Sequence, residues 1–362
     1  MSKEPIIILG AGLIGRLLAL SCAKEGYQVT VYDLGTPSVK GSAAYTAAAM
    51  LAPLAESVST ENNIIEMGIY SLKRWPEMIK ELSKPVFFQQ NGSLIVWHGQ
   101  DQSLGKHFQS QLAKTQQYFS SQFVYEKMDR EKLNQIESEI DHRFREALYL
   151  TNEGQLDNRE LLDALLEDAV SLGVKFFWES PREINDFRDV SYLKLIDCRG
   201  LGAKKSLDHL RGVRGEVIRV FAPEVNLQRP IRLLHPRYPI YIAPKDKQMF
   251  VIGATEIESE DNSEVSVRSA LELLSAAYSL HSGFAEGRIL EMNAQCRPSL
   301  PNNAPIIAKI NERVFTINGL YRHGFMISPA ILDAAMEMIF KNQSKLAQQF
   351  SIESTLPYAS HH

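Results

Sequence analysis

The first thirty residues carry the clearest pattern of hydrophobic and polar positions in the chain. Residues 5–9 form a short apolar run rich in β-branched side chains, which is typical of a buried strand. An apolar helix is predicted over residues 16–24, and a second strand over residues 28–32. Asp33 follows the second strand directly. The pattern therefore predicts a complete βαβ unit at the start of the chain.

The turn between the first strand and the helix has the pattern Gly-x-Gly-x-x-Gly, formed by Gly10, Gly12 and Gly15. Gly10 permits a tight turn, Gly12 lets backbone N–H groups approach a pyrophosphate, and Gly15 lets the helix pack closely on the strand. The helix N-terminus adds unpaired N–H groups and a positive dipole end. Asp33 is placed to accept hydrogen bonds from ribose hydroxyls. This context favours a dinucleotide site over an ordinary turn, although the motif does not distinguish FAD from NAD.

The same periodicity predicts the remaining elements. Helices are expected at residues 61–82, with a bend at Pro76, and at 101–118, 158–172, 267–282 and 330–340. Residues 87–97 are expected to form a hairpin around Asn91-Gly92, and residues 121–145 a charged, loosely helical stretch. Further strands are expected at 173–177, 194–197, 215–221, 231–235, 240–243, 249–253 and 313–318. Pro329 is expected at the first position of the last helix, and residues 343–362 as a frayed tail.

Alternation of strands and helices at both ends of the chain, with a β-rich stretch between them, indicates a mixed α/β (α+β) fold. We expect a Rossmann-like nucleotide-binding domain with an inserted, mostly antiparallel β-sheet domain for the substrate. The nucleotide domain is discontinuous and is assigned residues 1–82, 146–210 and 296–342. The substrate domain is assigned residues 83–145 and 211–295, and residues 343–362 are the C-terminal tail.

Composition excludes several classes of protein. The 362 residues are 44% hydrophobic and 23% charged, as in globular proteins, and a net charge of −4 gives no basic surface for nucleic acid. No apolar run is long enough to span a bilayer, and the short N-terminal run is expected to be a strand rather than a signal peptide. The three isolated cysteines favour a reducing compartment, with the cytoplasm expected, and oppose structural zinc or a paired-cysteine flavin reductase. We expect no metal site.

Two features allow more than one interpretation. The small residues of positions 41–53 suit either a helix N-terminus capped by Ser42 or the close approach of a flat ligand. Tyr241 lies within a predicted strand, where packing is the commoner role for a tyrosine.

No second Gly-x-Gly-x-x-Gly is present, so a small molecule is expected to donate the electrons rather than NAD(P)H.

Seven further segments of the chain, in this order, carry a family resemblance: residues 48–53 (AAMLAP), 197–203 (DCRGLGA), 211–216 (RGVRGE), 241–244 (YIAP), 253–255 (GAT), 297–298 (RP) and 321–324 (YRHG). With them the chain resembles the D-amino-acid-oxidase family of flavoproteins, and within it the bacterial glycine oxidases of thiamine biosynthesis. The resemblance runs from residue 6 to residue 339.

The resemblance implies that the cofactor is FAD, bound without a covalent link. It assigns to the cofactor the residues Gly10, Gly12, Leu13, Ile14, Gly15, Asp33, Ser42, Ala43, Ala48, Ala49, Met50, Val174, Gly200, Arg322, His323, Gly324, Phe325 and Met326. Ala49 stands where many relatives have glycine, which narrows the space beside the flavin.

The resemblance also implies the catalytic residues. Arg297 matches the arginine that holds the substrate carboxylate, Tyr241 matches a tyrosine that contacts the same carboxylate, and Arg322 matches a second active-site arginine. Glu256 stands where some glycine oxidases have an apolar residue, and its role stays open.

The expected reaction is oxidative deamination of glycine or another small amino acid by hydride transfer from Cα to flavin N5. Dioxygen is the expected acceptor, giving peroxide, and the imine either hydrolyses or enters thiazole synthesis for thiamine. The alternative is a D-amino-acid or secondary-amine dehydrogenase that uses a quinone or another acceptor. A third hypothesis is a flavin-binding protein without catalytic turnover. The oligomeric state stays open, with a homo-oligomer as one option.

Overall fold

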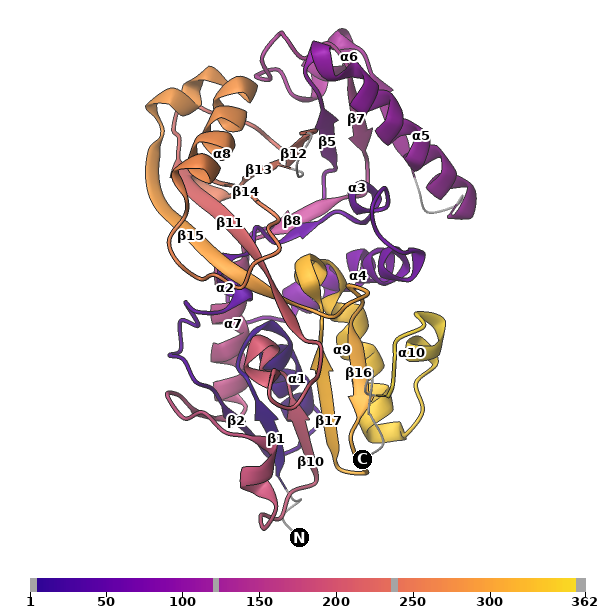
Figure 1. Ribbon diagram of the computed structural model, residues 1–362, viewed down its shortest axis with the longest axis vertical. Coiled ribbons are helices and arrows are strands. Elements are labelled where there is room, and N and C mark those ends of the chain that lie inside the picture. The colour runs from indigo at the N-terminus through magenta and orange to yellow at the C-terminus, as the bar shows by residue number, and fades with distance from the viewer. Residues whose placement is uncertain (1–4, 120–123, 236–239, 356–362) are drawn as a thin grey trace.

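The computed structural model describes residues 5–119, 124–235 and 240–355, which form two stacked parts (Figure 1). A six-stranded sheet lies in one part and an eight-stranded sheet in the other, and a small sheet lies between them. No helix within the described residues has the length and apolar character needed to cross a membrane. The mixed α/β fold predicted from the sequence is confirmed.

The six-stranded sheet has the strand order β16-β17-β10-β1-β2-β9. Neighbouring strands are parallel except for the pair β16–β17, which is antiparallel. Its strands are β1 (Ile6–Leu9), β2 (Val29–Tyr32), β9 (Lys175–Phe177), β10 (Lys194–Asp197), β16 (Ile306–Lys309) and β17 (Val314–Asn318). Because the parallel strands are covered on both faces, β1 is an unbroken apolar run, as the sequence pattern predicted.

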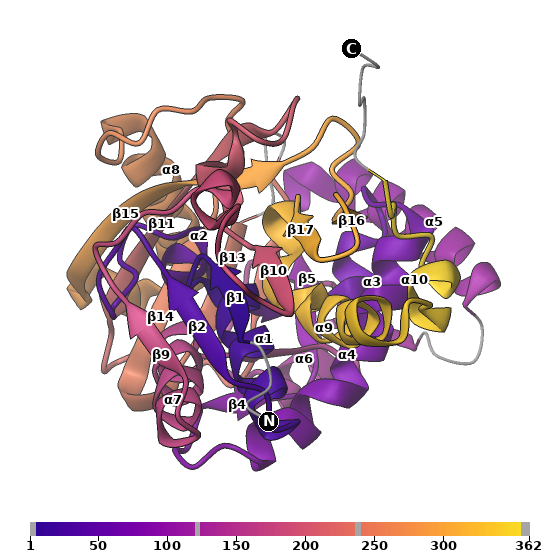
Figure 2. The same cartoon turned by 90° about the horizontal axis from the view of Figure 1, so that it is seen from below.

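Helices pack on one face of this sheet, as the view from below shows (Figure 2). They are α1 (Leu13–Lys24), α7 (Asn158–Ser171) and α9 (Gly324–Lys341), with α4 (Asn62–Lys80) packed on α9. Ile6 and Ile8 of β1 belong to the large core on this side, whereas Ile7 and Leu9 belong to a smaller core on the opposite side with Phe187. The alternation follows from the two-residue period of a strand.

The eight-stranded sheet has the order β15-β11-β14-β13-β12-β5-β7-β6, and only β12 and β5 pair in parallel. Its strands are β5 (Ser93–Val96), β6 (Tyr125–Met128), β7 (Ala147–Leu150), β11 (Arg211–Phe221), β12 (Ile231–Leu233), β13 (Ile240–Pro244), β14 (Met249–Gly253) and β15 (Arg288–Ser299). β7 pairs in this sheet with β5 and β6, although the segment 146–210 that contains it was assigned to the nucleotide domain. We propose the other domain bounds as stated above.

The remaining elements are short or lie at the periphery. The small sheet contains β3 (Met50–Leu51), β8 (Gly154–Leu156) and β4 (Phe88–Gln89). The other helices are α2 (Ala43–Thr46), α3 (Pro53–Glu56), α5 (Gln102–Tyr118), α6 (Arg130–Ile136), α8 (Val267–Leu280) and α10 (Lys345–Gln349). The 3₁₀ turns are η1 (Gly99–Asp101), η2 (Ile184–Phe187), η3 (Gly200–Ala203), η4 (Asp246–Gln248), η5 (Ser282–Glu286) and η6 (Tyr321–His323).

The helix predicted over residues 61–82 is confirmed as α4, which contains Pro76. Two local predictions between residues 87 and 145 are wrong. β4 and β5 do not form a hairpin: β4 pairs with β8, while β5 lies between β12 and β7 and all four of its residues are buried. Within 121–145 the described residues include the strand β6 as well as α6. In each case tertiary packing outweighed a local signal.

The last helix begins earlier than predicted, at Gly324, so Pro329 lies inside α9 rather than at its first position. Proline lacks an N–H, and the carbonyl four residues before it therefore loses its helical partner. In this structure the Trp75 indole N–H donates to that carbonyl, at Phe325, over 2.9 Å. A side chain from α4 thus replaces the missing backbone hydrogen bond.

The tail is not frayed over its described part. Residues 345–349 form α10, and Phe350 is fully buried with its ring against Tyr70. Glu353 forms a parallel bridge to Ile306 of the edge strand β16. Residues 356–362, including the two terminal histidines, lie outside the described residues.

Candidate functional site

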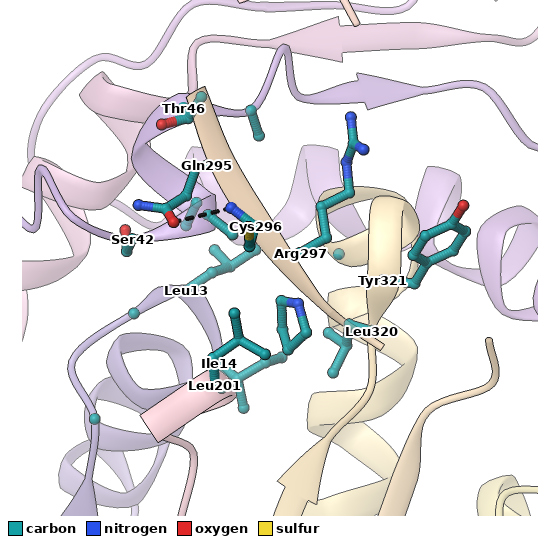
Figure 3. Close-up of a pocket in the computed structure, with 18 of the residues that line it drawn as sticks. Leu13, Ile14, Ser42, Thr46, Leu201, Gln295, Cys296, Arg297, Leu320 and Tyr321 are labelled. Carbon is teal, nitrogen blue, oxygen red and sulfur yellow. Dashed lines mark hydrogen bonds between the residues drawn. The ribbon is translucent and has the colours of Figure 1, made fainter. Parts of the chain in front are cut away.

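A cavity of about 750 Å³ lies between the carboxyl ends of the six-stranded sheet and the inner side of the eight-stranded sheet. The loops after β1, β2 and β10 line one end, and β13, β15 and the start of α9 line the other. The long strand β15, which the sequence pattern did not predict, carries Gln295, Cys296 and Arg297 along the cavity wall (Figure 3). Open α/β sheets bind ligands at this edge.

Nearly all of the residues assigned from the sequence line this cavity. They are Gly10, Gly12, Leu13, Ile14, Asp33, Ser42, Ala43, Ala48, Ala49, Met50, Gly200, Tyr241, Arg297, Arg322, His323, Gly324, Phe325 and Met326. Glu256, whose role the sequence left open, lines the cavity as well.

Two assigned residues do not line it. The α-carbon of Gly15 faces the carbonyl of Gly10, and a Cβ there would overlap that carbonyl, so Gly15 serves the packing of α1 on β1. Val174 is buried in the core between the six-stranded sheet and its helices. It precedes β9 and so lies at the amino end of that strand, whereas the cavity lies at the carboxyl ends.

The nucleotide end of the cavity is built from backbone groups and one carboxylate. Gly10 has φ +95°, and a Cβ there would lie 2.7 Å from the Cys198 carbonyl oxygen. Gly12 is the N-cap of α1, and a Cβ at this position would meet no atom within 4 Å, because the space beside it is open cavity. The Asp33 carboxylate accepts hydrogen bonds from the N–H groups of Ala11 (2.6 Å) and Gly35 (2.7 Å). This end therefore offers helix N–H groups and a fixed carboxylate.

The small-residue loop both begins a helix and lines the cavity. Ser42 caps α2 by accepting a hydrogen bond from the Tyr45 N–H, and residues 46–50 also line the cavity. Ala49 has φ +54°, the left-handed region that glycine occupies more easily. Lys245 Nζ donates to the Ala48 carbonyl of this loop (3.0 Å), and also to the Leu156 carbonyl (2.8 Å) and Gln155 Oε1 (3.0 Å) of β8.

At the other end of the cavity, Arg297 extends from β15 (Figure 3). Its guanidinium donates to two backbone carbonyls, Thr255 O at 3.1 Å and Arg214 O at 3.4 Å. Within the described part of the chain, no acidic side chain lies within ion-pair distance of it. Burial lowers the pKa of Arg297, although nearby Tyr321 and Glu256 act in the opposite direction. The site therefore presents a cation that lines the cavity and uses two of its five N–H donors on backbone carbonyls.

Arg322, in contrast, is paired twice. Its Nη2 lies 2.8 Å from Glu56 Oε2, and its Nη1 contacts Glu256 Oε2. Tyr321 Oη donates to Glu256 Oε1 over 2.6 Å, which fixes the second carboxylate in place. Burial lowers the pKa of Arg322, but Glu56 and Glu256 outweigh it, so the net shift is upward.

Tyr241 also has partners inside the protein. Its hydroxyl donates to Glu56 Oε1 at 3.1 Å and accepts from Arg232 Nη1 at 3.3 Å. Burial raises the pKa of this hydroxyl, which keeps its proton. For Tyr241 to donate to a ligand carboxylate, the hydroxyl must exchange Glu56 for that ligand, because a phenol has a single proton to donate.

Glu56 is the most important residue that the sequence analysis missed. It lies in α3, buried among Arg322, Arg232, His323 and Tyr241. Burial by itself raises the pKa of Glu56, but Arg322 and Arg232 outweigh burial and lower it to about 2. Burial lowers the pKa of the neighbouring His323 to about 4, so this imidazole is neutral near pH 7. A single glutamate in a short helix gave no signal in the sequence.

Pro181, Arg182 and Glu183 were missed at the nucleotide end. They follow β9 and reach the same edge of the sheet as Asp33. The signal for them was the predicted strand at residues 173–177, because a ligand is expected beyond the carboxyl end of such a strand and not at Val174 near its start.

Comparisons with known proteins agree with this geometry. The family model described as "FAD dependent oxidoreductase" (DAO) matches residues 5–337. The chain is 36% identical to a putative thiamine biosynthesis oxidoreductase ThiO of Rhizobium etli, over 94% of this chain and 98% of that protein. It is 24% identical to a glycine oxidase of Geobacillus kaustophilus over 90% of each chain.

Solved structures share the fold. The crystal structure of glycine oxidase from Geobacillus kaustophilus superposes with a TM-score of 0.82 over the full length of both chains, at 21% identity. That of iminodiacetate oxidase from Chelativorans sp. BNC1 also gives a TM-score of 0.82, at 18% identity, covering 97% of this chain and 100% of that one.

Proposed function

Because the chain belongs to the DAO family of FAD-dependent oxidoreductases, we propose that it oxidises glycine or another small amino acid with dioxygen as the electron acceptor. FAD is the cofactor of this family. The relatives named glycine oxidase and thiamine biosynthesis oxidoreductase support an amino-acid substrate.

The residues that line the cavity suit FAD in their chemistry. The open space beside Gly12, at the N-terminus of α1, suits the pyrophosphate, and the carboxylate of Asp33 suits a ribose. The small side chains of Ala48 and Ala49 leave room for the flat flavin ring. Gly324 begins α9, and a Cβ there would meet no atom within 4 Å. The positive end of this helix would face the negative charge that develops on a reduced flavin ring.

One observation carries the proposal: Arg297 lines the cavity with donors to spare and no acidic partner among the described residues. A guanidinium with that geometry binds a carboxylate through two parallel hydrogen bonds. Such binding fixes the orientation of an amino acid, and its Cα hydrogen then points in a constant direction. When bound, FAD supplies the hydride acceptor at N5.

The remaining residues orient and enclose the substrate. Tyr241 would add a donor to the same carboxylate by turning its hydroxyl away from Glu56. Near Arg297, Glu256 accepts a hydrogen bond from Tyr321 and pairs with Arg322. The mechanism needs orientation more than a strong acid or base, provided that the substrate amine is neutral before the hydride leaves.

The imine product would hydrolyse, or would serve as a precursor of the thiazole of thiamine. The name of the Rhizobium etli relative supports the second fate. A bifunctional ThiO/ThiG protein of Trichormus variabilis, which is 23% identical to this chain over 94% of its length, also supports the second fate.

The visible spectrum of the FAD-loaded protein tests the proposal. Anaerobic glycine should bleach the flavin, and air should restore it with formation of peroxide. Bleaching followed by recovery only with a quinone or dye would identify the dehydrogenase instead. A flavin that glycine, sarcosine and small D-amino acids all leave oxidised would contradict the amino-acid substrate. A protein that takes up no FAD would contradict the assignment of the cavity.

A further inference from the structure

The charged side chains beside Arg297 form a chain of alternating charge. Arg232 Nη1 lies 3.4 Å from Glu56 Oε1, and Arg322 Nη2 lies 2.8 Å from Glu56 Oε2. Arg322 Nη1 then contacts Glu256 Oε2 at the end of the chain. Two arginines and two glutamates take part, so their formal charges cancel.

Arg297 stands outside this neutral chain. The charged and titratable groups that act on it are Tyr321, Glu256, Arg322 and Glu56, and the tyrosine keeps its proton because burial and Glu256 raise its pKa. His323 is neutral near pH 7, since burial lowers its pKa to about 4. Among the described residues, Arg297 is therefore a cation of the substrate end without an acidic partner at ion-pair distance. It suits the single carboxylate of an amino acid.

We propose that Glu256 restricts the enzyme to amino acids with a single carboxylate. It accepts from Nη1 of Arg322, a donor that a second ligand carboxylate would need, and it places a negative charge near Arg297 at the substrate end of the cavity. The inference rests on the proposed function, because it assumes that Arg297 binds the substrate carboxylate.

Glu256 is held firmly enough for this role. The Tyr321 hydroxyl bonds one of its oxygens over 2.6 Å and Arg322 bonds the other, so it cannot swing away from a second anion without losing both contacts. Arg322 lowers the pKa of Glu256 against the effect of burial, and the side chain is ionised at neutral pH. Partly buried charges are poorly screened by salt, so the repulsion persists at ordinary ionic strength.

Two inert ethers measure this selectivity without turnover. Ethoxyacetate and diglycolate have similar size and the same ether oxygen, but diglycolate has a second carboxylate in place of a methyl group. Each is titrated into the FAD-loaded wild-type protein, and the dissociation constant is taken from the change in flavin absorbance. We expect diglycolate to bind at least roughly tenfold more weakly than ethoxyacetate, from like-charge repulsion at a few ångströms. Equal affinities for the wild type would overturn the proposal without any variant.

Glu256→Gln keeps the size of the side chain and an acceptor for Tyr321, but it removes the charge and releases Arg322. It should shift the ratio of the two dissociation constants toward diglycolate by on the order of tenfold or more. Glu258→Gln is the matched control: it removes the same charge two residues away, from a side chain that is 71% exposed and pairs with Arg211 outside the cavity. Its ratio should equal that of the wild type.

A ratio for Glu256→Gln within threefold of the wild type, or an equal shift in both variants, would contradict the role of Glu256. If glutamine at this position prevents folding, Glu256→Met is measured in the same way against the same limits. The proposed function fails in a different manner: neither ether would perturb the flavin and glycine would not reduce it. Failure of the selectivity alone would leave glycine reduction and ethoxyacetate binding intact.

Discussion

The guanidinium of Arg297 lies against the α-carbon of Gly215, in the space that a side chain at position 215 would fill. Gly215 lies on β11 opposite Gln295 of β15, and the arginine reaches back across the strand pair to the carbonyls of Arg214 and Thr255. Gly215 does not have the positive φ that would itself require glycine. The absence of a side chain is therefore explained by the position of the arginine.

The first prediction follows from this contact. Gly215→Ala should displace the Arg297 guanidinium from its carbonyl partners and raise the KM for glycine on the order of tenfold, while FAD stays bound. Steady-state kinetics and the flavin spectrum measure the two effects. Gly99→Ala is the control, since a Cβ there meets no atom within 4 Å and the residue lies outside the cavity. An unchanged KM for Gly215→Ala would mean that the arginine does not depend on this space.

Substitution of Arg297 itself should separate substrate binding from cofactor binding. Arg297→Ala removes two charge-assisted hydrogen bonds worth about 1.5–3 kcal/mol each, so KM for glycine should rise by on the order of a hundredfold or more. Arg297→Lys should recover only part of the loss, because an ammonium cannot form the bidentate pair. The control is Arg211→Ala, on the neighbouring strand and paired with the exposed Glu258. Normal glycine binding by Arg297→Ala would contradict the carboxylate assignment.

The third prediction concerns the hydrogen bond between Trp75 and the carbonyl of Phe325. Trp75→Phe should leave that buried carbonyl without its partner and lower the free energy of unfolding by about 2–3 kcal/mol. Pro329→Ala restores a backbone N–H that can bond the same carbonyl. Unfolding by urea of the two single variants and the double variant forms a cycle.

In that cycle, Trp75→Phe should cost about 1 kcal/mol less in the Pro329→Ala background than in the wild type. Additive costs, within about 0.5 kcal/mol, would show that the indole matters for its volume and not for its N–H. The FAD-loaded form is used throughout, so that loss of cofactor does not enter the comparison.

Acid should remove the contribution of Glu56. Its pKa is lowered from 4.5 to about 2, because Arg322 and Arg232 outweigh burial. A carboxyl group whose pKa is lower in the folded state binds fewer protons there than in the unfolded chain. The stability that it contributes is therefore fully present above pH 4.5 and is lost as the pH falls toward 2.

Glu56→Gln should accordingly cost about 3–5 kcal/mol at pH 7, since two buried cations lose their counter-charge. The difference between variant and wild type should shrink between pH 5 and pH 3, measured by urea unfolding at each pH. A difference that stays constant over this range would mean that Glu56 contributes through shape rather than charge. Glu258→Gln, which alters an exposed pair, should show little difference at any of these values.

The sequence by itself determined the nucleotide half of this protein. The apolar run at residues 6–9, the glycines at 10, 12 and 15 and the acid at 33 are close in the chain, and local rules act on close neighbours. Ser42 as a helix cap and the exact bounds of β10 and β14 were predictable for the same reason. The resemblance to a known family then supplied FAD and the arginine at position 297.

The tertiary structure alone decided the network around that arginine. Glu56, Arg232 and Glu256 come from α3, β12 and the segment after β14. Glu56 meets Arg232 across 176 positions of the chain, and Glu256 meets Arg322 across 66. The helix α9 could not be given its correct start, because the bond that lets it pass through Pro329 comes from Trp75 on another helix. Periodicity describes how one element buries its face, whereas charges from distant segments are brought together only when those elements pack.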